Sequence, residues 1–233
     1  MCHENSFNVN GKYLYLTIDL LTLFVPLLAS FYPKHAFFKN WPSLFKRIAI
    51  VGLFFLVWDA YFIHIGVWGF NERYLSGIKV FNLPLEEVLF FICIPYSSVF
   101  VYFSMEYLLK KNPLEKLHKL ITHFLLTFST VVFVMHYDKW YSASIFGLLA
   151  LYLLFHLYRK TYLGRHYVSY TITLVFFFIV NGILTGSFIE EPVVWYNNTE
   201  NLGIRMGTIP FEDAFYGFLL ISAIIDWFDY FRK

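Results

Sequence analysis

Residues 77–87 read GIKVFNLPLEE, and residues 203–213 read GIRMGTIPFED. The two segments align without a gap at an offset of 126 residues. The glycine, the isoleucine, the basic residue, the proline and the two final acids all fall in register. Chance similarity in an apolar sequence would match aliphatic residues, but not this ordered set of glycine, base, proline and acids. The segments therefore indicate an internal duplication of the chain.

The sequence around these segments is typical of a membrane protein. Hydrophobic residues make up 58% of the 233 residues and charged residues only 15%, whereas about a quarter of a soluble domain is charged. Continuous apolar runs near the spanning length of about 20 residues predict transmembrane helices rather than a barrel. There are seven such runs, at residues 13–31, 48–68, 85–108, 117–135, 141–158, 167–188 and 211–231.

The same offset relates the helices of the two halves. It carries the first run onto the fifth, the third onto the seventh, and the second onto the sixth with a short loop insertion. The predicted fold is an all-α transmembrane bundle of about seven helices, in which residues 109–138 link the repeats 1–108 and 139–233. A three-helix repeat ends on the opposite side of the membrane, and the fourth helix returns the chain to the starting side before the second repeat begins. The two repeats therefore have the same orientation and are related by a pseudo-two-fold axis along the membrane normal. Both acidic segments then lie at the same membrane face.

The distribution of basic residues predicts the orientation. The N-terminal side of the membrane carries 5 lysines and arginines, and the opposite side carries 13. The positive-inside rule then predicts that the N-terminus lies outside and the C-terminus in the cytoplasm. The expected location of this integral membrane protein is a bacterial cytoplasmic membrane. A net charge of +2 is too small to suggest a nucleic-acid partner. Cys2 and Cys93 form neither a metal-ligand spacing nor a disulfide framework.

The paired acids Glu86–Glu87 and Glu212–Asp213 follow a proline that suits the first turn of a helix. Carboxylates there could simply complement the helix dipole. Two matched copies at one face of an apolar bundle favour a functional role over simple helix capping, because placing ionisable groups near hydrocarbon costs free energy. Consecutive helical residues point about 100° apart, so one acid of each pair can face the interior. A desolvated carboxyl group that stays protonated can act as a general acid on an apolar substrate.

Other polar residues admit simpler interpretations. Asp59 lies midway along the second run and has Asn181 as its approximate counterpart, so it either bonds a neighbouring helix or lies near a reaction site. Glu106 is expected either to extend toward the membrane interface or to pair with a nearby lysine. The single Asp226-x-x-Asp229 motif predicts an interfacial polar pair, because a prenyltransferase would need a second acidic cluster. Packing roles are predicted for His64, His123, His136, His156 and His166.

Several motifs are absent from the sequence. It contains neither a Gly-x-Gly-x-x-Gly dinucleotide fingerprint nor a Walker A loop. The seventh run has no lysine before Lys233, which argues against a retinal Schiff base.

The repeated Pro-x-Glu-acid motifs resemble those of membrane-embedded carotenoid cyclases, of the heterodimeric or fused lycopene cyclase type. In that family each half is a three-helix unit, and this chain resembles the fused form over nearly its whole length. The resemblance does not extend to the phytoene synthase domain that fungal fusions carry. The similar segments are residues 84–91 (PLEEVLFF) with Pro95-Tyr96, 181–186 (NGILTG), 191–197 (EPVVWYN) and 212–218 (EDAFYGF).

The resemblance implies a lycopene β-cyclase, an intramolecular lyase-type isomerase of carotenoid biosynthesis. Such an enzyme converts the linear ends of lycopene into β-ionone rings by acid–base carbocation chemistry, with no redox change. Glu86 and Glu212 are then predicted as the acid–base pair, tuned by Glu87 and Asp213, with Asp59 as the first alternative acid. Aromatic faces stabilise cations. Substrate-binding candidates, each of which could equally be a packing residue, are Trp58, Tyr61, Trp68, Phe90, Asn181 and Tyr216.

The resemblance also sets the expected partners. These are lycopene or a related carotenoid, the lipid bilayer and other enzymes of the carotenoid pathway, with no cofactor, flavin, metal or nucleic acid. The number of ends cyclised, the ring type and the substrate length stay open. The alternative from another class is a small transporter or lipid-binding protein that uses the carboxylates as a proton relay.

Overall fold

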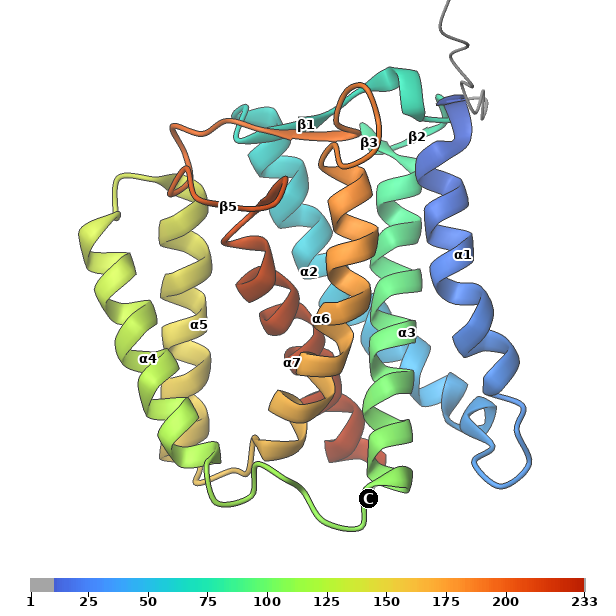
Figure 1. The fold of residues 1–233 in the computed structure, drawn as a ribbon, viewed down its shortest axis with the longest axis vertical. Coiled ribbons are helices and arrows are strands. Elements are labelled where there is room, and N and C mark those ends of the chain that lie inside the picture. The colour runs from blue at the N-terminus through green and yellow to red at the C-terminus, as the bar shows by residue number, and fades with distance from the viewer. Residues whose placement is uncertain (1–10, 233) are drawn as a thin grey trace, which may run out of the picture.

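The computed structural model describes residues 11–232, and within them seven α-helices run side by side (Figure 1). The predicted all-α transmembrane bundle with an internal repeat is thereby confirmed. Helices α1 to α6 are each long and apolar enough to cross a membrane. The helices are α1 (Leu14–Ala29), α2 (Trp41–His64), α3 (Leu85–Leu108), α4 (His118–Met135), α5 (Trp140–Tyr158), α6 (Gly164–Leu184) and α7 (Asp213–Arg232), with short 3-10 turns at Gly11–Tyr13, Phe37–Asn40 and Glu72–Tyr74.

Two helices, α2 and α6, differ from the predicted apolar runs by more than two residues in their bounds. Helix α2 begins seven residues before the predicted run, because its first turns carry polar residues and a proline near the helix start, which a helix end tolerates. It ends at His64, just before Gly66 takes a φ of 76°. Helix α6 ends at Leu184, just before Gly186 takes a φ of 116°. Such left-handed positions terminate helices, and glycine adopts them at low cost.

The two duplicated segments form matched hairpins that lead directly into helices α3 and α7. Strand β2 (Lys79–Val80) pairs with β3 (Leu83–Pro84), and β5 (Arg205–Met206) pairs with β6 (Ile209–Pro210). Their two-residue turns begin with left-handed residues at Phe81 and Gly207. Both hairpins lie at the same end of the bundle (Figure 1), as parallel repeats require.

A third antiparallel sheet joins the repeats at that end. Strand β1 (Trp68–Phe70) pairs with β4 (Val194–Tyr196), with Gly69 opposite Trp195. These two central residues are 126 positions apart, so the pseudo-two-fold axis passes between them. A Cβ atom at position 69 would collide with the Trp195 ring, which explains the glycine.

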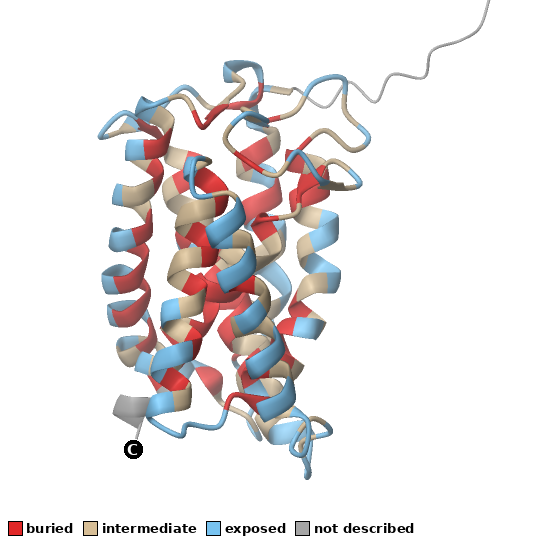
Figure 2. Ribbon diagram, turned by 90° about the vertical axis from the view of Figure 1, so that its left-hand side faces the viewer, coloured by how far each residue is buried: buried red, intermediate tan, exposed pale blue. Residues whose placement is uncertain are grey.

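The two repeats interlock rather than lie beside one another. Helix α2 of the first repeat packs on α7 of the second, and α3 packs on α6. The linker helix α4 packs on α5 at the outside of the bundle (Figure 1). Exposed residues lie on the outer helix faces (Figure 2). Many exposed residues of the helices are large and apolar, as lipid contact requires. The interior of the bundle is therefore formed jointly by the two repeats.

Candidate functional site

Glu86 and Glu212 anchor the loops that precede the hairpins. Both side chains are fully buried. Oε1 of Glu86 accepts a hydrogen bond of 2.6 Å from the backbone N–H of Ser76, and Oε1 of Glu212 accepts one of 2.6 Å from Leu202. Ser142 also donates to Glu212 at 2.6 Å. The second oxygen of each glutamate has no hydrogen-bond partner among the described residues.

The neighbouring acids, Glu87 and Asp213, face a cavity of about 500 Å³. Asp59 lines the same cavity, so three carboxyl groups from α2, α3 and α7 meet there. Glu86 and Glu212 do not line it, because consecutive residues of a helix point about 100° apart. The tyrosines of the cavity are Tyr15, Tyr141, Tyr170, Tyr196 and Tyr216.

The carboxyl groups of Asp59 and Glu87 line the same cavity and interact with each other. The hydroxyl of Tyr15 donates to Oε2 of Glu87 at 2.7 Å, and that of Tyr216 donates to Oδ1 of Asp59 at 2.8 Å. A carboxylate only accepts hydrogen bonds, so two carboxyl groups can bond each other only when one is protonated. One proton shared between Asp59 and Glu87 would allow such a bond in this mostly apolar cavity.

Asp213 has a different environment, because its partners are neutral donors. Oδ1 accepts a hydrogen bond from the Tyr141 hydroxyl at 2.5 Å. Oδ2 accepts bonds from the Asn181 side-chain amide at 2.8 Å and from the Tyr196 hydroxyl at 2.9 Å. Three donors stabilise the ionised form of a carboxyl group. Burial raises the pKa of Tyr196, and the charge of Asp213 raises it further, so this phenol remains a donor.

The two clusters are related by the duplication but are chemically unequal. Tyr15 and Tyr141 are 126 residues apart, as are Glu87 and Asp213, and each tyrosine donates to the acid of its own repeat. Asn181 takes the place beside Asp213 that Asp59 takes beside Glu87. One cluster thus holds two carboxyl groups and the other holds one.

The cavity reaches the outer surface of the bundle between α1 and α6. Its lining includes Leu21 and Val25 of α1 and Phe176 of α6, which are 66%, 67% and 56% exposed. Along α3 the lining continues from Glu87 to Val101, a helical length of about 20 Å. An elongated apolar molecule can therefore reach the acids from the surrounding hydrocarbon.

The predicted substrate-binding residues divide into two groups. Trp68, Phe90, Asn181 and Tyr216 line the cavity. Trp58 and Tyr61 are not part of its lining. Trp58 packs beside Tyr216, with ring centroids 5.5 Å apart, and Tyr61 is half exposed on α2 beside Trp140.

Sequence reasoning missed Asp19, a buried acid on α1. It lies one helical turn after Tyr15, and neither carboxyl oxygen has a hydrogen-bond partner among the described residues. The sequence did contain a signal for this residue, because an aspartate inside the first apolar run is unusual. The cavity tyrosines were also missed, although Tyr15 and Tyr141 share the offset of the duplication.

The remaining polar candidates lie away from this cavity. Glu106 pairs with Arg165 at 2.7 Å. Asp226 pairs with His156 and His166 at 3.0 Å each, which ties α5 and α6 to α7. The side chain of Asp229 lies outside the described residues. In the part of the chain that the structure describes, no three His, Cys, Asp or Glu side chains are arranged to hold a metal ion.

Comparison with known proteins adds evidence independent of the geometry. A family model described as lycopene cyclase matches residues 12–105 and 138–231. These matched segments are offset by 126 residues, so each covers one repeat. The bifunctional lycopene cyclase/phytoene synthase of Pyrenophora tritici-repentis (strain Pt-1C-BFP) is 39% identical over 56 residues, which is 24% of this chain and 9% of that protein. No solved structure matches.

Proposed function

The chain belongs to the lycopene cyclase family, and on this premise we propose that it isomerises lycopene to β-carotene in the cavity between its repeats. The observation that carries the proposal is the meeting of Asp59, Glu87 and Asp213 in one buried cavity that opens toward the bilayer. Lycopene is a hydrocarbon and dissolves in the bilayer, so an entrance between α1 and α6 suits it. Membrane-embedded carboxyl groups are costly, which favours a function for all three.

The Asp59–Glu87 pair is the proposed general acid. Its shared proton passes to the terminal double bond of lycopene, and the resulting carbocation is attacked by the neighbouring double bond to close a six-membered ring. Asp213, held ionised by three donors, stabilises the positive charge and accepts the proton that leaves the ring. One proton is added and one is removed, so the product is an isomer and no redox change occurs.

This proposal places the proton transfers on the cavity acids in place of the predicted pair Glu86 and Glu212. The first reason is exposure to the substrate, since those two glutamates do not line the cavity. The second is that each already accepts a hydrogen bond from the backbone of its own loop. They support the site by fixing the first turn of α3 and α7.

Aromatic rings supply the rest of the proposed site. Phe90 lies 6.2 Å from Tyr15, and Trp68 lies 4.9 Å from Tyr141, measured between ring centroids. Each ring face can stabilise a nearby cation by about 0.5–2 kcal/mol. Aromatic faces stabilise the carbocation without offering a nucleophile that would trap it.

Expression in cells that accumulate lycopene tests the activity. We expect lycopene to fall and β-carotene to appear, as measured by liquid chromatography of extracted pigments. Glu87→Gln and Asp213→Asn should each lower turnover by at least about 100-fold, the usual scale of acid–base catalysis. Unchanged lycopene, with the protein present in the membrane, would exclude the cyclase and favour the transporter or lipid-binding alternative.

The orientation is also proposed, with the N-terminus outside and the C-terminus in the cytoplasm. Its support is the excess of lysine and arginine on the side opposite the acids. A reporter enzyme fused after Lys233 should be active in the cytoplasm. Activity of the same fusion outside the membrane would reverse the assignment.

A further inference from the structure

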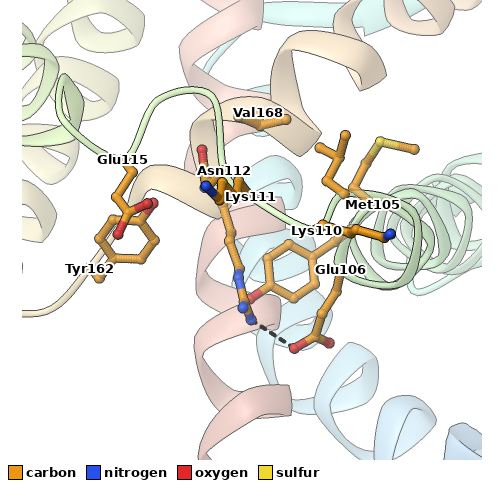
Figure 3. Close-up of a pocket in the computed structure, with 11 residues that line it drawn as sticks. Met105, Glu106, Lys110, Lys111, Asn112, Glu115, Tyr162 and Val168 are labelled. Carbon is orange, nitrogen blue, oxygen red and sulfur yellow. Dashed lines mark hydrogen bonds and ion pairs between the residues drawn. The ribbon is translucent and has the colours of Figure 1, made fainter.

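A second cavity, of about 330 Å³, lies where α3 ends and α6 begins (Figure 3). Helix α3 carries Glu87 at its first turn and Met105 at its last, which are about 27 Å apart along the helix. The two cavities share no lining residue, and this one lies toward the opposite membrane face. Its lining comes from α3, from the α3–α4 loop and from the start of α6.

Basic side chains dominate the charged part of this lining. Lys110, Lys111 and Arg165 face two carboxylates, Glu106 and Glu115. Arg165 donates to Glu106 at 2.7 Å, so one carboxylate is already neutralised. Among the described residues, no ion pair is formed by Lys110 or Lys111. Two ammonium groups are thus available beside a guanidinium, which is the kind of donor set that binds phosphate.

The same cavity has an apolar wall. Met105, Leu109 and Val168 contribute to it, and Tyr102 adds an aromatic ring. Figure 3 shows Met105 beside Glu106 and Lys110, with Glu115 and Tyr162 at the other side. The cavity therefore combines cations at the end of the bundle with apolar groups on the spanning helices. A ligand that fits both parts carries a phosphate joined to a hydrocarbon chain.

The position of the cavity supports a ligand from the membrane. It lies at the level where α3 and α6 leave the apolar region, on the side that carries 13 of the 18 lysines and arginines. Basic pockets between transmembrane helices on that side are known to bind lipid headgroups. We propose that this cavity binds an anionic phospholipid, with its phosphate at Lys110, Lys111 and Arg165 and its chain along Met105 and Leu109. The proposal does not depend on the cyclase chemistry.

The test measures lipid bound to the purified full-length protein in detergent, by native mass spectrometry with added phosphatidylglycerol. The double variant Lys110→Gln/Lys111→Gln should bind at least about ten-fold less lipid than the parent. The matched control Lys34→Gln/Lys39→Gln removes the same charge from the same side at exposed positions outside the cavity. It should bind within about two-fold of the parent. An equal loss in both double variants would overturn the proposal, because binding would then depend on overall charge.

Two competitors distinguish a lipid from a free phosphate compound. Inorganic phosphate and glycerophosphoglycerol carry the phosphate without the chains, so neither should displace phosphatidylglycerol at millimolar concentration. Displacement by either would show that a water-soluble phosphate is the ligand and would overturn the lipid assignment. Phosphatidylcholine that binds as tightly as phosphatidylglycerol would overturn the requirement for an anionic headgroup.

Discussion

The hydroxyl of Tyr216 lies 2.8 Å from Oδ1 of Asp59, although the two residues are 157 positions apart and belong to different repeats. Asp59 in turn interacts with Glu87 of its own repeat. The carboxyl pair proposed as the general acid therefore has a hydrogen-bond donor on a helix of the other repeat. Neither repeat alone contains the whole site, and the packing of α2 on α7 is what assembles it.

Tyr216→Phe tests this contact between the repeats. The change removes the donor to Asp59 and keeps the ring, so turnover should fall about ten-fold, which corresponds to about 1.4 kcal/mol. Conversion of lycopene in membranes is the measurement. Tyr167→Phe is the control, because it loses a hydroxyl contact with Thr122 outside the cavity lining and should leave turnover nearly unchanged. Equal losses in both variants would argue for a general packing effect.

Val25→Trp tests the opening between α1 and α6. Val25 lines the cavity and is 67% exposed, so a larger ring there should obstruct the passage from the bilayer. We expect initial rates at least about ten-fold lower, with the bundle intact because the ring lies at its outer surface. Leu28→Trp, on the same helix but outside the cavity lining, should retain the parent rate. Substrate that enters elsewhere would leave both variants active.

Glu86→Gln and Glu212→Gln separate anchoring from catalysis. A glutamine still offers a carbonyl oxygen to the backbone N–H of Ser76 or Leu202, so turnover should stay within about ten-fold of the parent. Glu212→Leu leaves that N–H and the Ser142 hydroxyl without their acceptor, which should cost about 1–3 kcal/mol and lower the melting temperature in detergent. If Glu86→Gln abolished turnover at an unchanged melting temperature, the acid would be Glu86 rather than Glu87.

Asp19→Leu should stabilise the protein. The carboxyl group of Asp19 is buried with no hydrogen-bond partner among the described residues, and such a group costs about 1–3 kcal/mol. Thermal melting in detergent should therefore shift upward for Asp19→Leu and change little for Asp19→Asn, which keeps a buried polar group. A lower melting temperature for Asp19→Leu would mean that the carboxyl group has a stabilising partner in the membrane.

The sequence by itself determined the fold class, the duplication and the position of both acid pairs at one end of the bundle. These features depend on the length of the apolar runs and on an offset of 126 residues, both of which can be read from the order of residues without any contact between helices. Four of the six residues predicted to bind substrate line the cavity, namely Trp68, Phe90, Asn181 and Tyr216, and their role stays a prediction.

Only the tertiary structure decided which acid of each pair faces the cavity. Glu86 and Glu87 are consecutive, and their directions depend on how α3 is rotated against α2 and α6. That rotation is set by packing between helices, which no local pattern encodes. The same holds for the pairing of Asp59 with Glu87 and for the burial of Asp19, because each depends on contacts between helices far apart in the sequence.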